Sequence, residues 1–131
     1  MNILVGYDGS NAARRALELA AQHAKVFGAK LEIVTSIQRS QTLNHQEVQM
    51  AEKSLEDQVK LFFAEDDVPF ETNVLISSLS PGENIVWYSR TKAIDAIFIG
   101  LKRRSKVGKL VFGSTAQYVI LNAPCPVVTI R

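Results

Sequence analysis

Residues 3–10 read ILVGYDGS, an apolar run followed at once by a turn and the start of a helix. Ile3 to Val5 predict a buried strand that the next four residues end. Ser10 is a typical N-cap, and after it Ala and Leu recur every three or four positions as far as Gly28. A strand that leads directly into a helix is the repeating unit of α/β proteins, so this stretch sets the expected class of fold.

The same unit recurs along the chain. Further strands are predicted over Leu31 to Ile37, Phe70 to Ile76, Asp95 to Gly100 and Val127 to Ile130. Further helices are predicted from Asn44 to about Glu65, from Ser80 to about Lys92, and from Ser114 onward with Val119 and Ile120 facing inward. Strict alternation without a repeat or linker predicts a doubly wound α/β fold: a three-layer sandwich with a five-stranded parallel sheet in the order 3-2-1-4-5.

Length and composition indicate an ordinary globular protein. The chain has 131 residues, 47% of them hydrophobic and 21% charged, and a single domain over 1–131 is expected. No apolar run approaches the ~20 residues of a membrane span, and no signal peptide is recognisable at the start, so a cytoplasmic location is expected. The one cysteine, Cys125, has no disulfide partner in the chain, and we expect a packed thiol.

In the predicted strand order the first and fourth strands are neighbours where the winding reverses. Ligands of α/β proteins bind there, at the carboxyl ends of the strands. Two glycine-containing stretches meet at that point, residues 6–10 and residues 100–115, the latter reading GLKRRSKVGKLVFGST. Five of the fifteen Lys and Arg lie in the second stretch, while the rest of the chain holds ten against thirteen acidic residues, a formal charge of −3. This local charge needs its own explanation.

The residue types at the crevice support two interpretations. Gly100 and Gly113 allow backbone N–H groups to approach an anion, and Ser114 and Thr115 add hydroxyls at a helix N-terminus, which suits a phosphate. Alternatively, the glycines only form turns, Ser114 is an N-cap and the basic residues are solvated. Asp8 is suited to hydrogen bonds with a ribose or adenine, to a divalent cation, or only to an Asp-Gly turn. The residues alone leave these alternatives open.

Several other chemistries lack their motifs. The sequence contains no G-x-x-x-x-G-K-[ST] loop, no G-x-G-x-x-G after the first strand and no G-x-S-x-G elbow. His23 and His45 have no partner at metal-ligand spacing, so no metal site is expected. The basic stretch has no interleaved aromatics and no helix to enter a groove, so nucleic acid is not an expected partner.

The combination of pieces resembles the universal stress protein family over essentially the full length. The matching pieces are ILVGYDGS with the Ala-rich helix after it, LEIVTSI, DAIFIG, the loop that closes in GST, and APCPVVTIR. The resemblance implies a fold of the adenine nucleotide alpha hydrolase-like type. It also implies a homodimer that pairs the last strands of two subunits, here Pro126 to Ile130, and an exposed sheet edge needs such cover.

Many members of that family bind ATP through a glycine, two residues, a second glycine, nine residues, and a glycine followed by Ser or Thr. Gly100 and the pair Gly113-Ser114 match the two ends of this pattern at the family spacing, but Arg103 replaces the middle glycine. If that position requires a positive φ, Arg103 distorts the loop that would hold the phosphates. If glycine is needed there only because it takes little space, the Arg103 guanidinium can bind phosphate. By the same alignment, Asp8 is the acidic residue near the nucleotide, and Ser36 takes the position whose backbone meets adenine.

The resemblance therefore implies a stress-response protein that binds ATP or another adenine nucleotide, alone or with Mg²⁺, in a regulatory or signalling role. The predicted nucleotide-binding residues are Asp8, Ser36, Gly100, Lys102, Arg103, Gly113, Ser114 and Thr115. No general base is assigned, so weak ATP hydrolysis is the most that we expect of it as an enzyme. The alternative is a nucleotide-free, dimeric protein-interaction module that uses the dimer surface and the basic loop.

Overall fold

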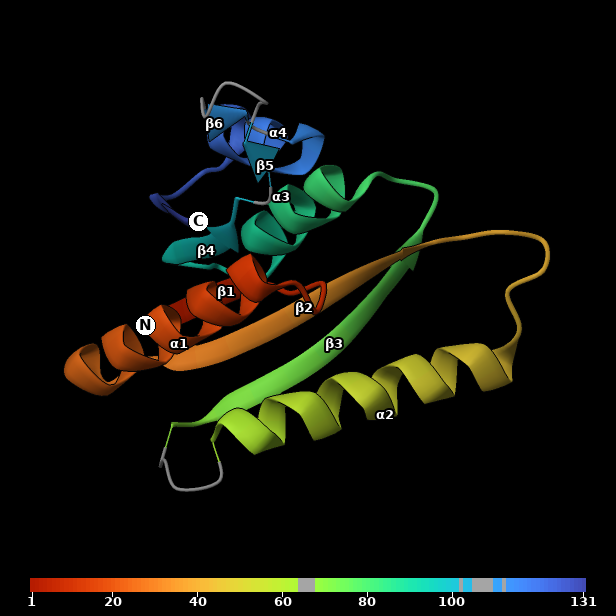
Figure 1. Cartoon of the computed structure of the whole chain (residues 1–131), viewed down its shortest axis with the longest axis horizontal. Coiled ribbons are helices and arrows are strands. Elements are labelled where there is room, and N and C mark those ends of the chain that lie inside the picture. The colour runs from red at the N-terminus through yellow and green to blue at the C-terminus, as the bar shows by residue number, and fades with distance from the viewer. Residues whose placement is uncertain (64–67, 102, 105–109, 112) are drawn as a thin grey trace.

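The computed structural model describes residues 1–63, 68–101, 103–104, 110–111 and 113–131, with only the backbone described at 103–104 and 110–111. The helices are α1 Asn11–Phe27, α2 His45–Phe62, α3 Pro81–Thr91 and α4 Ser114–Asn122. The strands are β1 Asn2–Gly6, β2 Lys30–Gln38, β3 Phe70–Ser77, β4 Ala96–Gly100, β5 Arg103–Arg104, β6 Leu110–Val111 and β7 Val127–Ile130. Figure 1 shows this order along the chain.

The main sheet has the predicted topology. Its five strands are parallel in the order β3-β2-β1-β4-β7, so the predicted order is confirmed with β7 as the fifth strand. The ladder runs from Asn2↔Lys30 to Gly6↔Val34 between β1 and β2, and from Ile3↔Ala96 to Val5↔Phe98 between β1 and β4. The winding therefore reverses between β1 and β4, at the expected point.

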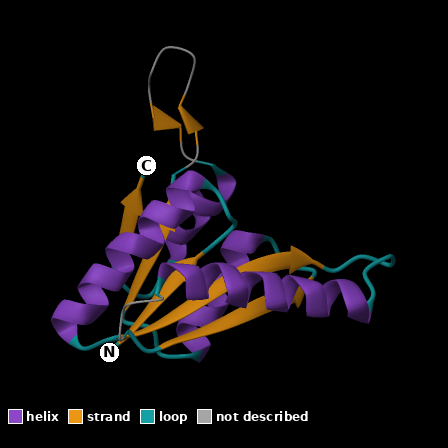
Figure 2. Ribbon diagram, turned by 60° about the horizontal axis from the view of Figure 1, so that its bottom comes forward, coloured by secondary structure: helices purple, strands orange, loops and turns teal. Residues whose placement is uncertain are grey.

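Helices cover both faces of the sheet (Figure 2). Two apolar cores lie between the sheet and these helices. Ile3 and Val5 of β1 join the core beneath α1 and α2, whereas Leu4 between them joins the core beneath α3 and α4. Phe98 and Ile97 of β4 divide in the same way. Because both faces are buried, the central strands are continuously apolar rather than alternating.

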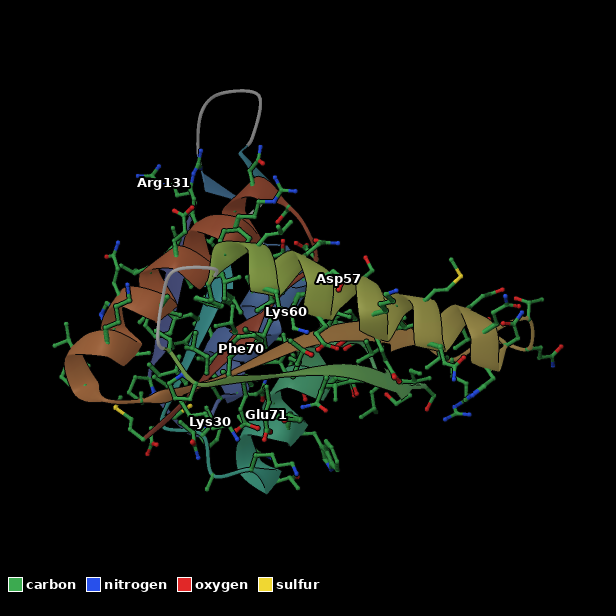
Figure 3. The ribbon with its side chains drawn as sticks, turned by 90° about the horizontal axis from the view of Figure 1, so that it is seen from below. Lys30, Asp57, Lys60, Phe70, Glu71 and Arg131 are labelled. Atoms are coloured by element: carbon green, nitrogen blue, oxygen red, sulfur yellow. The ribbon has the colours of Figure 1, made fainter. Side chains whose placement is uncertain are left out.

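The edge strand β3 is joined to β2 by the backbone ladder from Leu31↔Phe70 to Gln38↔Ser77, and its side chains make two further contacts. Lys30 of β2 pairs with Glu71 of β3 at 2.7 Å between Nζ and Oε1 (Figure 3), and the Phe70 ring centroid is 5.3 Å from that of Phe63 beyond α2. The exposed Lys30–Glu71 ion pair contributes little to stability. The other edge of the sheet is β7, at the opposite end of the strand order.

The helix starts agree with the sequence, including the start of α4 at Ser114. Ser10, Asn44 and Ser80 are N-caps, each accepting a backbone N–H three residues on. At α4 the N-cap is Gly113, and Ser114 is the first helical residue, so the alternative in which Ser114 is the cap is wrong.

Two further predictions about the helices need comment. Ile120 is 43% exposed, against 0% for Val119, so the expectation that both face inward is wrong. The two are consecutive, about 100° apart around the helix, and only Val119 points to the sheet. Helix α2 ends at Phe62, and its predicted end at about Glu65 lies outside the described residues.

Strands β5 and β6 interrupt the stretch that the sequence predicts to be a loop. They pair antiparallel through Arg103↔Val111 and Arg104↔Leu110, and Figure 2 shows them standing beyond the sheet and helices. Each strand has only two residues, which is too short for a recognisable alternation. Arg103 thus lies in extended backbone.

Candidate functional site

A cavity of about 310 Å³ opens at the carboxyl ends of β1 and β4, where the winding reverses. Six of the eight predicted site residues line it: Asp8, Ser36, Gly100, Gly113, Ser114 and Thr115. Of the other two, Lys102 lies outside the described residues, and Arg103 is described only by its backbone. The structure therefore brings together the predicted residues of both glycine-containing stretches.

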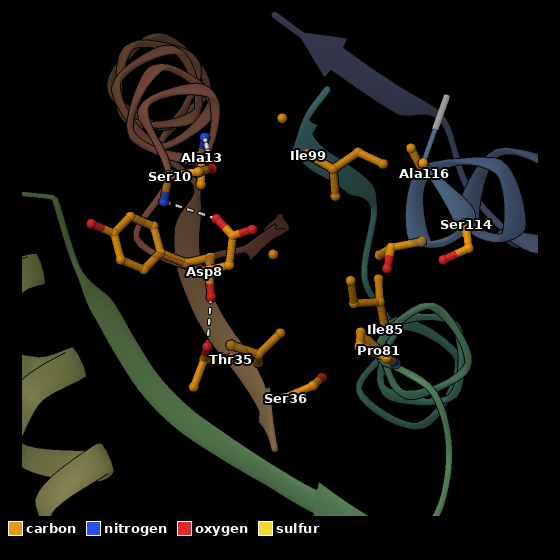
Figure 4. A pocket seen from close by; sticks show the side chains of 16 residues that line it. Asp8, Ser10, Ala13, Thr35, Ser36, Pro81, Ile85, Ile99, Ser114 and Ala116 are labelled. Atoms are coloured by element: carbon orange, nitrogen blue, oxygen red, sulfur yellow. Dashed lines mark hydrogen bonds between the residues drawn. The ribbon is translucent and has the colours of Figure 1, made fainter. Parts of the chain in front are cut away.

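The cavity has walls of different chemistry (Figure 4). Asp8, Thr35 and Ser36 lie on one side, at the ends of β1 and β2, while Ser114 stands opposite at the start of α4. Ile99 of β4 and the α3 residues Pro81 and Ile85 add apolar surface. A mixture of apolar walls and a few polar groups is typical of small-molecule sites.

Sequence reasoning missed the contribution of α3. Its cap signature predicted the helix start at Ser80, but the position of Pro81 over the cavity depends on how α3 crosses the sheet. Thr35 of β2, which also lines the cavity, was missed as well, although its neighbour Ser36 was identified. No local signal distinguishes either residue from an ordinary structural one.

The Asp8 side of the cavity is a tight turn. The backbone N–H of Ser10 donates to Oδ1 of Asp8 at 2.9 Å, and Gly9 has a φ of 81°, which favours glycine. Ser10 Oγ in turn accepts the N–H of Ala13 at 3.1 Å and caps α1. The turn and the ligand interpretations of Asp8 are thus compatible, because the turn holds a carboxylate that lines the cavity.

The opposite side is the N-terminus of α4. Gly113 has φ −68° and ψ 164°, and among the described residues no side chain caps the helix and none lies within 4 Å of a Cβ placed on Gly113. Neither backbone conformation nor packing therefore requires glycine at this position. The first N–H groups of a helix have no partner within it and carry the positive end of the dipole. This wall is suited to an anion.

Gly100 has a packing role that the sequence did not reveal. It lies at the end of β4, and the space that a Cβ would take is filled by Ala12 in the first turn of α1. The missing side chain thus allows the contact between α1 and β4, a reason for glycine that does not depend on an anion. Gly6 similarly leaves room for the Ile85 side chain beside the cavity.

Groups for other chemistry are sparse in the described part of the chain. Asp8 is the one acidic residue among the described cavity walls, and no three His, Cys, Asp or Glu gather there as a metal site.

Burial, together with the charge of Asp95, raises the pKa of the half-buried Cys125 thiol. Among the residues that the structure describes, no helix is long and apolar enough to cross a bilayer.

Comparisons with known proteins agree with this architecture. The model of the universal stress protein family matches residues 1–131. A Thermus aquaticus relative, named as the universal stress protein in the QAH/OAS sulfhydrylase 3′ region, is 31% identical, with 98% of this chain and 97% of the relative covered. A universal stress protein structure from Archaeoglobus fulgidus has a TM-score of 0.86 at 31% identity, covering 100% of this chain and 98% of its own.

A second Archaeoglobus fulgidus structure carries a ligand. It is a universal stress protein in complex with dAMP, with a TM-score of 0.82 at 27% identity, and it covers 100% of this chain and 98% of its own.

Proposed function

The chain belongs to the universal stress protein family, and from this membership and its cavity we propose that it binds an adenine nucleotide between β1 and β4. The observation that carries the proposal is the uncapped N-terminus of α4 at Gly113, which faces the cavity. The complex of a 27% identical relative with dAMP supports an adenine nucleotide as the ligand.

In the proposal the two sides of the cavity bind different parts of the nucleotide. The first-turn amides of α4, with the hydroxyls of Ser114 and Thr115, are suited to a phosphate group, because a helix N-terminus favours negative charge. Asp8 and Ser36, on the other side, are suited to the ribose and the base. In the proposal Gly100 borders the phosphate, and Arg103 with Lys102 adds positive charge.

We propose binding rather than efficient hydrolysis. The one acidic residue of the described walls, Asp8, already accepts the Ser10 N–H at 2.9 Å and belongs to a turn, so no described carboxylate is set aside as a general base. A protein that binds ATP or AMP without consuming it can report nucleotide level, and this supports a regulatory or signalling role in the cytoplasm.

A homodimer through β7 is part of the proposal. β7 is an edge of the sheet, and its residues Val127 to Ile130 are all partly exposed. An uncovered edge offers unpaired backbone groups to another strand, and a second copy of the chain supplies one by two-fold symmetry.

Calorimetric titration with AMP, dAMP, ADP and ATP, each with and without Mg²⁺, tests the nucleotide proposal. We expect saturable binding in the micromolar range. The blocking variant is Gly113→Asp, whose carboxylate caps α4 and repels a phosphate; affinity is expected to fall by at least about tenfold while stability is kept or slightly raised. Gly113→Asn adds a cap without the charge, so it is expected to weaken binding less.

Two results would count against this function. Absence of heat at millimolar nucleotide would favour the alternative of a nucleotide-free interaction module. Undiminished binding by Gly113→Asp would mean that the phosphate does not lie at α4.

A further inference from the structure

Tyr7, the residue directly after β1, is held by hydrogen bonds in three directions. Its N–H donates to the Val34 carbonyl at 2.8 Å, and its carbonyl accepts the Thr35 hydroxyl at 2.6 Å (Figure 4). Its phenol donates to Oε1 of Gln58 at 3.2 Å. The side chain is buried in the core beneath α1 and α2. Both the backbone and the side chain of Tyr7 are therefore fixed.

The partner of the phenol is itself held in place. Gln58 lies on α2, and its Nε2 donates to Ser54 Oγ one turn earlier at 3.0 Å. Its neighbours on the helix, Leu55 and Val59, are buried against the sheet. Because these two residues anchor α2, the Gln58 side chain is a firm support for the Tyr7 hydroxyl.

Asp8 receives this support from the residue that precedes it in the chain. The residue after it is Gly9, with φ 81°, which adds conformational freedom rather than restraint. Tyr7 and Asp8 both line the cavity, but along an extended chain consecutive side chains point to opposite faces, so the Tyr7 ring enters the core below α2. The position of the Asp8 carboxylate is thus set by the bonds of Tyr7 and by the Ser10 N–H.

We propose that Tyr7, supported by Gln58, is a positioning residue that holds the Asp8 carboxylate toward the ribose of the bound nucleotide. The inference rests on the proposed function, since it needs a nucleotide in the cavity. It extends the determinants of affinity to α2, on the face of the sheet opposite to α3 and α4. Neither the Tyr7 hydroxyl nor Gln58 needs to touch the ligand.

A double-mutant cycle tests this role. Tyr7→Phe removes only the hydroxyl, and it is compared in the native chain and in the Asp8→Asn chain by calorimetry with AMP. Because Tyr7 and Asp8 are coupled neighbours in one hydrogen-bond network, Tyr7→Phe in the native chain is expected to lower the affinity for AMP by about three- to tenfold. In the Asp8→Asn chain the same change is expected to cost less than about 1.5-fold, because the group that Tyr7 positions is already gone.

Two further variants test the support of the phenol and control for the loss of a tyrosine hydroxyl. Gln58→Leu removes the acceptor of the phenol without touching the cavity walls and is expected to reproduce the Tyr7→Phe loss. Tyr118→Phe makes the same chemical change on an exposed tyrosine of α4 outside the cavity, and its affinity is expected to stay native. Equal losses in both Asp8 backgrounds, or no loss from Tyr7→Phe, would overturn the inference.

A measurement without nucleotide separates this inference from the proposed function. The Ser10 N–H donates to Asp8, so its hydrogen exchange is expected to quicken in Tyr7→Phe while the urea midpoint stays close to native. If the native chain fails to bind AMP, the proposed function fails and this exchange rate decides the positioning role by itself. Unchanged exchange at Ser10 would overturn it.

Discussion

A Cβ atom on Gly100 would lie 2.5 Å from the carbonyl carbon of Ala12. Ala12 belongs to the first turn of α1, and its backbone therefore rests directly on the end of β4. No side chain fits between them without moving α1 away from the sheet. The contact fixes the distance between the two elements that flank the cavity.

Gly100→Ala is accordingly expected to destabilise the fold. Overpacking against backbone costs about 1 to 3 kcal/mol, so urea unfolding followed by circular dichroism is expected to show a lower midpoint. The matched control is Gly113→Ala, where a Cβ meets none of the described residues within 4 Å and the cost is expected to stay below about 1 kcal/mol. Similar losses in the two variants would contradict the packing explanation.

The capping box of α3 supports a second prediction. Ser80 Oγ accepts the Glu83 N–H at 3.3 Å, and Glu83 Oε1 accepts the Ser80 N–H at 3.2 Å. Ser80→Ala removes the cap and is expected to lower the free energy of unfolding by about 1 kcal/mol. Ser78→Ala, at an exposed position that caps no helix, serves as the control for thermal unfolding, and an equal shift there would refute the role of the box.

A buried pair predicts a dependence on alkaline pH. The Tyr88 hydroxyl donates to Oε1 of Glu32 at 2.8 Å and accepts from Asn73 at 3.0 Å. Burial, then the bond to Glu32 and its charge, raises the pKa of Tyr88 well above the usual range for tyrosine. In the unfolded chain the phenol ionises near pH 10. The pair's contribution is therefore complete below that pH and is lost as the pH rises further, because the unfolded chain releases a proton that the folded chain keeps.

Urea unfolding between neutral pH and pH 11 measures this loss. The free energy of unfolding of the native chain is expected to fall steadily above about pH 10. That of Tyr88→Phe is expected to be lower at neutral pH by about 1 to 3 kcal/mol, because Glu32 loses its partner, and to fall less steeply as the pH rises. Tyr118→Phe, at the exposed tyrosine, is expected to keep the native slope. Parallel curves for the native chain and Tyr88→Phe would show that the pair has no such role.

The β7 edge allows a variant that separates dimerisation from folding. The carbonyls of Pro126 and Ile130 accept the N–H groups of Ile97 and Leu101, so the intervening Val127 and Thr129 turn their backbone groups away from β4. Thr129→Pro thus removes an outward N–H and leaves the bonds to β4 intact. Sedimentation is expected to show a folded monomer where the native chain is a dimer. Val128→Pro, which breaks a bond to β4, is expected to destabilise the fold itself. A Thr129→Pro chain that still forms the dimer would exclude pairing through β7.

The fold could be predicted because its signals are local and repeated. Runs such as Ile3 to Val5 and Asp95 to Gly100 mark buried strands, Ser10 and Ser80 mark helix starts, and alternation restricts the topology to few solutions. The β5–β6 hairpin escaped prediction because two-residue strands carry no period. Ile120 was misplaced because a short apolar helix does not reveal which of two adjacent residues faces inward.

The cavity was located correctly, but the reasons for its residues were only partly recognised. Strand order places Asp8 and Gly113 at one crevice, and the spacing between Gly100 and Gly113 can be read from the sequence. The role of Gly100 depends on Ala12, which lies far away in sequence and shows no pattern of its own. Tyr7 and Pro81 depend on the positions of α2 and α3, and these are settled by packing rather than by local sequence.

Glycine at the N-cap of α4 leaves the helix less stable than a side-chain cap would, but it leaves the first amides open to a ligand. Asp, Asn, Ser or Thr at position 113 would each strengthen the helix, yet each would occupy the amides that the nucleotide needs in the proposed function. Laboratory evolution for heat resistance alone is expected to replace Gly113 with one of these residues. Selection for nucleotide binding is expected to restore the glycine. The residue at position 113 would therefore indicate whether a variant was selected for stability or for binding.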